Sequence, residues 1–267
     1  SSDHERLKYI VGLLNPGLVF AASGDAYGRA IDAAVPKNVE CVVTGKATAG
    51  QHATLFPALE CAAPGGEVDR AHDAVGPDHV AKILFTSGST GAPKGVINTQ
   101  RMLCHNQQMI LQSLPHYGEV PPVFVDWLPW HHTAGGNNDF GLILYNGGTL
   151  YIDEGRPQPD LIGPTVRNLR EIATTAYISV PRGYEALLPY LHEDSALRER
   201  FFSRLGFLFY AGAALSQPVW KAYEELAVRT CGERIAWITS LGSTETAPFA
   251  MCTSRGACLR MVASTAG

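Results

Sequence analysis

Short apolar runs of strand length recur along the chain, separated by stretches with helical spacing. Residues 18–22 and 39–43 are near-continuous apolar runs, and residues 24–35 between them repeat apolar side chains at helical intervals. This order predicts a β-α-β unit. From residue 44 to residue 77 the periodicity fades and Ala, Gly, Pro, Asp and His predominate, which predicts a long surface connection.

The alternation of apolar runs and helical spacing resumes near residue 80. We expect strands at residues 80–85, 123–127, 149–152, 176–180, 207–210 and 235–239. We expect helices at residues 99–114, 138–145, 165–172, 182–192, 195–205 and 217–231. This pattern is typical of a mainly parallel sheet with helices on both faces, so we predict an α/β fold. In such sheets functional residues lie in the loops after the strands.

Composition and charge exclude several classes of protein. The 267 residues are 46% hydrophobic and 17% charged, which is too apolar for a disordered chain. Lys and Arg number 21 against 25 Asp and Glu, and no basic run is present, so we do not expect a nucleic-acid partner. The longest apolar stretch, residues 140–152, is interrupted by Asn and Gly and is shorter than the roughly 20 residues that span a bilayer, so we expect no membrane span.

Cysteine usage and the first residues indicate the compartment and origin of the chain. The six cysteines form no Cys-x-x-Cys pair, so neither a zinc site nor a disulfide framework is indicated, and we expect reduced thiols in the cytoplasm. They are Cys41, Cys61, Cys104, Cys231, Cys252 and Cys258. The chain begins Ser-Ser-Asp-His without Met or an apolar leader, which favours a processed protein or a piece of a longer one.

The strongest chemical signal is the segment Phe-Thr-Ser-Gly-Ser-Thr-Gly-Ala-Pro-Lys-Gly-Val at residues 85–96. Glycines let backbone amides approach a ligand, hydroxyls donate to phosphate oxygens, and the lysine adds positive charge, so we predict a phosphate cradle. Its residues are Thr86, Ser87, Gly88, Ser89, Thr90, Gly91 and Lys94. Pro93 stands where a Walker A loop has Gly, and Gly95 follows the lysine, which disfavours that motif. The alternative is a solvated Ser/Gly turn.

Residues 85–96 resemble the phosphate-loop signature of the adenylate-forming superfamily, which includes acyl-CoA synthetases, luciferases and peptide-synthetase adenylation domains. Leu241-Gly242-Ser243-Thr244-Glu245 resembles the aromatic-Gly-x-Thr-Glu element of that superfamily. The resemblance implies that Thr244 binds the α-phosphate and that Glu245 holds magnesium, a cation that prefers carboxylate oxygen. Leu241 replaces the aromatic residue that packs on adenine. Alone, a Thr-Glu pair is more often a helix start.

Two further segments resemble the same superfamily. Residues 128–136 match its Pro-x-aromatic-His-x-x-Gly element, which implies that His132 lines the route from the nucleotide to the acyl group. Taken alone, a His pair favours a packed or capping role, and no third ligand stands at a metal-binding spacing. Gly212, Ala213 and Ala214 resemble a Ser-Gly-Ala-Ala-Pro segment whose small residues admit adenine and the acyl chain, although Leu215 stands in place of the proline. Alone, that segment is most simply a close strand–helix packing turn.

Within the superfamily, residues 7–251 look most like feruloyl-CoA synthetases, through stretches such as VINTQRMLCHNQQM and LYNGGTLYIDEGRP. That subgroup implies ATP-dependent activation of an aromatic carboxylic acid to an acyl-adenylate, followed by transfer to coenzyme A. The implied cofactors are ATP, magnesium and coenzyme A, and the partner is a small-molecule carboxylic acid. Magnesium and Lys94 would neutralise the departing pyrophosphate.

The resemblance also implies a large N-terminal domain and a small mobile C-terminal domain. We assign residues 1–251 to part of the N-terminal AMP-binding domain, and we expect residues 252–267 not to match the family. We expect the ribose-binding Thr-Gly-Asp element and the C-terminal domain with its adenylation lysine to be absent. Two alternatives stay open: a non-catalytic remnant that binds adenine nucleotides, and a magnesium-dependent phosphotransferase that explains the phosphate cradle alone.

Overall fold

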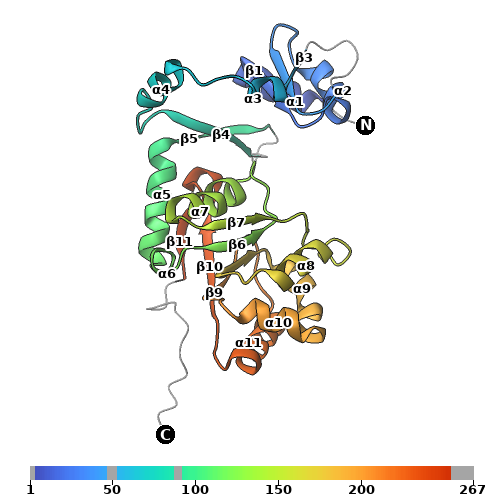
Figure 1. Cartoon of the computed structure of the whole chain (residues 1–267), viewed down its shortest axis with the longest axis vertical. Coiled ribbons are helices and arrows are strands. Elements are labelled where there is room, and N and C mark those ends of the chain that lie inside the picture. Colours follow the sequence, from blue (N-terminus) through green and yellow to red (C-terminus); the bar gives the residue numbers. More distant parts are fainter. Residues whose placement is uncertain (1–3, 47–52, 87–91, 254–267) are drawn as a thin grey trace. The chain divides into compact units, whose positions relative to one another are not determined.

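The computed structural model describes residues 4–46, 53–86 and 92–253 of the chain. The chain forms two compact units (Figure 1), and neither is one continuous stretch of sequence. Unit 1 takes residues 1–76 and 85–95, and unit 2 takes residues 77–84 and 96–267. Strands β4 (Val80–Thr86) and β5 (Lys94–Thr99) pair with each other and run across the boundaries of this division.

Unit 1 contains the predicted β-α-β motif. Strands β1 (Leu18–Ala21) and β2 (Glu40–Val43) pair in parallel, and helix α2 (Gly24–Ala34) connects them. The helix begins where it does because the Ser23 hydroxyl accepts a hydrogen bond from the Ala26 N–H at 3.2 Å. The prediction for residues 18–43 is therefore confirmed.

The predicted surface connection at residues 44–77 was wrong over much of its length. It contains β3 (Ala53–Leu55), which pairs in parallel with β2, and helices α3 (Phe56–Glu60) and α4 (Gly66–Asp73). Strand β3 is only three residues long, and both helices are short and contain no buried residue. Such elements leave no hydrophobic period to detect. Helix α1 (Glu5–Leu14) was not predicted either.

Unit 2 is built on mainly parallel strands. They are β6 (Val123–Asp126), β7 (Thr149–Ile152), β8 (Ala176–Ser179), β9 (Phe207–Tyr210), β10 (Ala236–Gly242) and β11 (Phe249–Cys252). Strands β8, β9 and β10 run parallel, β11 joins β10 antiparallel, and β6 pairs in parallel with β7. The Thr175 N–H donates to the Val123 carbonyl at 3.1 Å, which places β6 beside β8.

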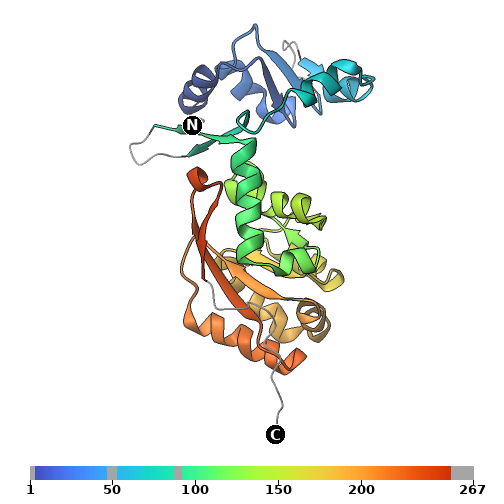
Figure 2. The same cartoon turned by 90° about the vertical axis from the view of Figure 1, so that its left-hand side faces the viewer.

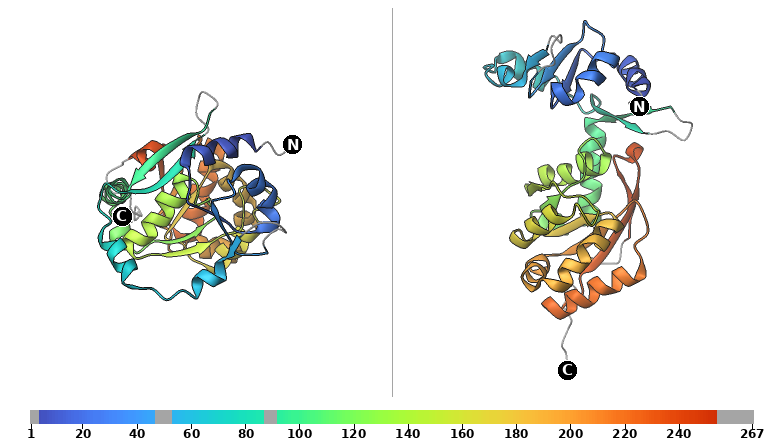
Figure 3. Two further views of the ribbon diagram at one scale, coloured as in Figure 1. Left: turned by 90° about the horizontal axis from the view of Figure 1, so that it is seen from above. Right: turned by 90° about the vertical axis from the view of Figure 1, so that its right-hand side faces the viewer.

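Helices cover both faces of these strands, as the alternating directions of strand side chains require. On β9, Phe207 and Phe209 belong to one core cluster, while Leu208 belongs to the other. The first face carries α5 (Gln100–Ser113), α6 (His116–Glu119) and α7 (Phe140–Asn146). The second carries α8 (Gly163–Glu171), α9 (Pro181–Glu193), α10 (Ser195–Phe202) and α11 (Gln217–Cys231), drawn in yellow and orange in the right-hand view of Figure 3. The predicted α/β class is confirmed.

The second face has a core of edge-to-face aromatic rings. The Tyr184 ring lies 5.3 Å from Tyr177, 5.4 Å from Tyr223 and 4.9 Å from Trp237, measured between centroids. Its hydroxyl lies 2.8 Å from the Tyr177 carbonyl and 2.7 Å from the Phe209 carbonyl. Tyr184 therefore joins α9 to two neighbouring strands by both packing and hydrogen bonding.

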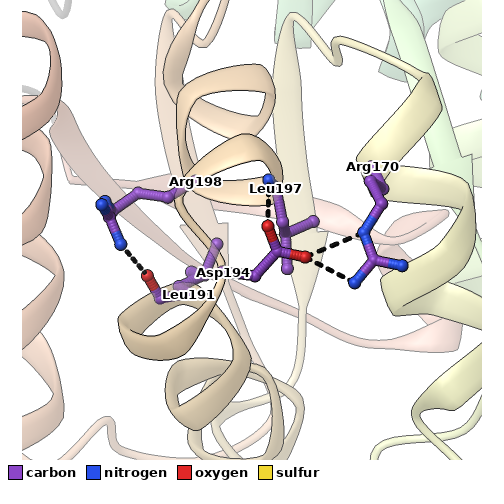
Figure 4. A network of polar contacts seen from close by, with 5 residues as sticks. All are labelled: Arg170, Leu191, Asp194, Leu197 and Arg198. Atoms are coloured by element: carbon purple, nitrogen blue, oxygen red, sulfur yellow. Dashed lines mark hydrogen bonds and ion pairs between the residues drawn. The ribbon is translucent and has the colours of Figure 1, made fainter.

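A polar network fastens the helices of this face to one another (Figure 4). The Asp194 carboxylate caps α10 by accepting the Leu197 N–H at 3.0 Å, and it also pairs with Arg170 of α8. The Leu197 N–H and the Arg170 guanidinium hold the pKa of Asp194 below its ordinary value. Arg198 donates to the Leu191 carbonyl at the end of α9 at 2.9 Å.

Several elements of unit 2 depart from the expected boundaries. The helix predicted at residues 138–145 begins as a π-helix, η1 (Ala134–Asp139), before α7. Strand β10 extends to Gly242 because β11, which was not predicted, pairs with residues beyond the parallel ladder. Strand β5 and helix α6 were also missed.

Two features of the described residues bear on membrane insertion and on disulfide bonds. No helix in the described part of the chain is long and apolar enough to cross a membrane. The five described cysteines are free thiols, and Cys258 lies outside the described residues.

We expect Tyr184→Phe to lower the free energy of unfolding by about 1–3 kcal/mol, because it removes the hydroxyl donor from two buried strand carbonyls. Urea unfolding measures this change. Tyr190→Phe on the exposed side of α9 is the control and should stay within about 0.5 kcal/mol of the wild type. Equal effects of the two variants would contradict a structural role for the Tyr184 hydroxyl.

Candidate functional site

The parallel strands of unit 2 end at one edge, where three of the predicted site segments leave the sheet. Ser179, Tyr210 and Thr239 are in register across β8, β9 and β10. Gly212 and Leu241 each lie two residues beyond the Tyr210–Thr239 pair, so the two segments emerge side by side. The turn that carries His132 follows β6 at the same edge.

The turn after β10 is shaped by residues on either side of the Thr-Glu pair. Thr244–Thr246 form a 3-10 helix, capped reciprocally by the Ser243 and Thr246 side chains. A Cβ on Gly242 would lie 1.5 Å from the Pro248 carbonyl oxygen, so only glycine fits there. Thr244 and Glu245 thus begin a short helix, whose capping side chains are those of Ser243 and Thr246; the predicted roles of Thr244 and Glu245 toward phosphate and magnesium stay predictions.

Thr244 and Glu245 offer a donor set that fits magnesium delivered with a nucleotide. Glu245 is exposed and Thr244 is half-buried, so consecutive residues of this turn offer a carboxylate and a hydroxyl. Magnesium in nucleotide sites is typically held by one or two carboxylates, substrate phosphates and water. Within residues 4–46, 53–86 and 92–253, no group of three His, Cys, Asp or Glu side chains could hold a metal alone. Phosphate and water oxygens would therefore have to complete the coordination.

The turn after β9 presents bare backbone to its surroundings. Gly212 has a φ of +85°, a conformation that favours glycine, and a Cβ built there would meet nothing within 4 Å. Ala213 and Ala214 are exposed as well. Gly212 is therefore not a close-packing position, contrary to the simplest interpretation of this segment. Leu241, 63% exposed, provides apolar surface on the neighbouring strand.

His132 sits in a tightly folded turn with its ring exposed. Its Nδ1 accepts the Ala134 N–H at 3.1 Å, so the neutral ring assigned by this contact carries its proton on Nε2. A Cβ on Gly135 would lie 2.6 Å from the Leu128 carbonyl oxygen, and one on Gly136 would lie 2.1 Å from that of Trp130. His132 thus accepts a backbone N–H within its own turn, and the Nε2–H is the group left to donate to an anion.

A buried polar network supports this turn, and the sequence interpretation missed it. Asn137 Nδ2 donates to Asn98 Oδ1 at 2.7 Å and to Thr133 Oγ1 at 3.1 Å. Lys82 Nζ lies 3.4 Å from the Gly136 carbonyl oxygen, and burial lowers the pKa of this lysine. These contacts connect the η1 segment to strands β4 and β5.

Two buried carboxyl groups lie at the ends of the His132 turn. Asp126 is 5% exposed and Asp139 is fully buried. Burial is the main cause that raises the pKa of Asp126 to about 6, while burial and the charge of Asp126 raise the pKa of Asp139 well above its ordinary value. Burial and the neighbouring carboxylate therefore favour the protonated form of Asp139. Nearby Asp153 adds to the upward shift of Asp126.

The proposed phosphate cradle is described only at its edges. Thr86 ends β4, and the exposed Lys94 begins β5, so they flank the loop between two paired strands. Ser87, Gly88, Ser89, Thr90 and Gly91 lie outside the described residues. The cradle stays a prediction.

We expect Asp139→Asn to stabilise the protein at pH 8 by about 1–3 kcal/mol and to have little effect at pH 4. The native state binds more protons than the unfolded state here, because the folded pKa values of both carboxyl groups are raised, so wild-type stability falls as pH rises from about 4 through 6. The asparagine amide has nearly the same shape as the carboxyl group and brings no charge into the interior. Urea unfolding at pH 4, 6 and 8 measures this, with exposed Asp160→Asn as control. Parallel stability–pH curves for Asp139→Asn and the wild type would contradict the raised pKa of Asp139.

Comparison with known proteins finds relatives that are named as ligases. The chain is 46% identical over 59 residues to the medium-chain-fatty-acid–[acyl-carrier-protein] ligase TtuA of Teredinibacter turnerae, covering 22% of this chain and 9% of that protein. It is 30% identical over 175 residues to the probable CoA ligase CCL8 of Humulus lupulus, covering 59% of this chain and 27% of that protein.

Solved structures share the fold at lower identity. A benzoate CoA ligase from Burkholderia xenovorans LB400 matches with a TM-score of 0.69 and 20% identity, over 93% of this chain and 45% of that one. ATP-bound MatB from Rhodopseudomonas palustris matches with a TM-score of 0.70 and 20% identity, over 97% and 46%. The chain thus spans about half the length of these structures.

The sequence profile of the AMP-binding enzyme family matches residues 1–267. This match runs through residue 251, so it marks no boundary there, and the assignment of residues 252–267 to a separate tail stays a prediction. Because the match covers the whole chain, this protein belongs to the AMP-binding enzyme family.

Proposed function

We propose that this chain is part of a ligase that activates a carboxylic acid with ATP and transfers the acyl group to coenzyme A. The observation that carries this proposal is the set of three turns at one sheet edge, which present an imidazole N–H, a Thr-Glu pair and bare glycine backbone. Family membership and relatives named as CoA or acyl-carrier-protein ligases support it.

The chemistry joins two anions, so the site must supply donors where charge concentrates. A carboxylate oxygen forms a bond to the α-phosphorus of ATP as the bond to pyrophosphate breaks, and the thiol of coenzyme A then displaces AMP from the acyl-adenylate. In this proposal the Thr244 hydroxyl binds the α-phosphate, and the His132 Nε2–H orients the carboxylate. Glu245 would hold magnesium, which supplies positive charge to the phosphates when bound.

The nucleotide base and the acid would use the exposed small-residue turn. Gly212, Ala213 and Ala214 leave backbone accessible, and Leu241 offers apolar surface in place of an aromatic ring. We further propose an aromatic acid of the feruloyl type, because residues 7–251 resemble feruloyl-CoA synthetases and a planar ring needs the space that small side chains leave. A cytoplasmic location belongs to the same proposal.

We expect Lys94→Ala to weaken binding of magnesium–ATP roughly tenfold to a hundredfold and to change AMP binding little. The lysine is proposed to contact the β- and γ-phosphates, which AMP lacks, and a charge-assisted hydrogen bond accounts for that range. Calorimetric titration of both nucleotides measures the difference. Lys37→Ala, an exposed lysine of the same unit, is the control. Equal losses for ATP and AMP would contradict the assignment of Lys94.

We expect residues 1–267 alone to catalyse slow ATP–pyrophosphate exchange with ferulate, and faster exchange when a family C-terminal domain is supplied in trans. That domain would bring the adenylation lysine, and losing one such electrostatic donor typically costs about a hundred- to a thousandfold in rate. Glu245→Gln should suppress the stimulated exchange. Nucleotide binding without exchange under any of these conditions would favour the non-catalytic remnant instead. Exchange with other acids but not with ferulate would reject only the proposed substrate.

A further inference from the structure

Helix α5 carries two consecutive buried amide side chains that reach different turns of the candidate site. Figure 2 shows α5, in green, running beside β10 and β11, in red. Asn106 is 3% exposed, and its Nδ2 donates to the Thr246 carbonyl at 2.8 Å and to the Phe249 carbonyl at 3.0 Å. These carbonyls lie immediately after the Thr-Glu pair and at the start of β11. Asn106 therefore fixes the far end of the turn that presents Thr244 and Glu245.

Gln107, the next residue, reaches the other turn. Its Nε2 donates to the Asn137 carbonyl at 2.7 Å, in the π-helix that follows His132. A Cβ on Gly141 would lie 2.4 Å from this nitrogen, so the glycine leaves the space that the amide occupies. Asn137 in turn donates to Thr133, the neighbour of His132. Gln107 is therefore connected to the His132 turn through one residue.

The chemistry of the two side chains suits this task. The Asn106 contacts fall on carbonyls of the Thr246–Phe249 turn, and a buried carbonyl without a donor is costly. A primary amide supplies two donors from one nitrogen without bringing a charge into the interior. Placing both amides on one helix gives the two turns a common support.

We propose that Asn106 and Gln107 are positioning residues that separately set the Thr244-Glu245 turn and the His132 turn. The importance of those turns for a reaction rests on the function proposed above. The geometry predicts that the two amides act on different turns. Loss of the Asn106 amide should increase the motion of the Thr244-Glu245 turn only, and loss of the Gln107 amide should increase the motion of the His132 turn only. A purely structural role would instead loosen both turns and the whole unit together.

Hydrogen exchange of the 267-residue protein without ligand tests the positioning directly. The variants Asn106→Leu and Gln107→Met keep side-chain size but remove the donors. We expect Asn106→Leu to raise amide exchange in residues 243–249 about tenfold and to leave residues 132–139 unchanged, and Gln107→Met to give the converse. Helix α11 is the internal reference, and Gln112→Met on the exposed side of α5 is the control variant. A uniform increase in both turns and α11, or no increase in either turn, would overturn the proposal.

Binding measurements separate this proposal from the proposed function. Asn106→Leu should weaken magnesium–ATP about tenfold, whereas Gln107→Met should stay within about twofold of the wild type. If exchange is selective but the wild type binds no magnesium–ATP, the positioning stands and the proposed function fails. If the wild type binds magnesium–ATP and both variants weaken this binding equally, the proposal that the two amides act on different turns is overturned. Should Asn106→Leu not fold, Asn106→Ser, which retains one donor, should give the same pattern of exchange at smaller amplitude.

Discussion

Hydrogen bonding of the backbone where strands leave the sheet is the constraint on which the rest of unit 2 depends. The N–H and C=O groups of a strand form hydrogen bonds with the neighbouring strands, but these hydrogen bonds end at the last paired residue. Beyond Asp126 and Gly242 the chain turns sharply against other elements, and side chains replace the ladder: Asp126 accepts the Leu128 N–H, and Ser243 and Thr246 cap each other's turn. The exposed groups of the candidate site exist because these partners hold the backbone beneath them.

Much of the fold could be predicted because buried helices and strands repeat apolar residues at regular intervals in the sequence. The strands of unit 2 from β6 to β10 are short apolar runs, and α11 was predicted over the residues that it occupies. The missed strand β3 is only three residues long, and β11 returns antiparallel to β10 after a short turn, so neither follows the strand–helix–strand spacing that guided the prediction. The π-helix before α7 could not be predicted, since its residues Ala-Gly-Gly-Asn-Asn-Asp carry no apolar face. The close approach of Gly135 and Gly136 to the preceding turn is visible only in the tertiary structure.

The residues of the candidate site also fall into some that the sequence predicted and some that it did not. His132, Thr244 and Glu245 were found because they stand in short motifs next to glycines, where the local sequence itself restricts the backbone. Asn106, Gln107 and Asp139 were not found, because a polar residue in a helical stretch is expected to face water. Only the tertiary structure brings residue 106 to residues 246 and 249. Asp126 had one usable signal, a carboxylate that closes an otherwise apolar strand.

The division of the chain into discontinuous units has a consequence for synthesis on the ribosome. The chain passes between units 1 and 2 three times, at residues 76–77, 84–85 and 95–96. Residues 77–84 belong to unit 2, where Lys82 contacts the Gly136 carbonyl, a residue made 54 positions later. During synthesis, residues 77–84 therefore stay exposed to solvent until residue 136 has been translated. A polypeptide begun at residue 96 would lack both this contact and the Arg101–Asp78 ion pair, so unit 2 is not a module that can be excised by a single cut.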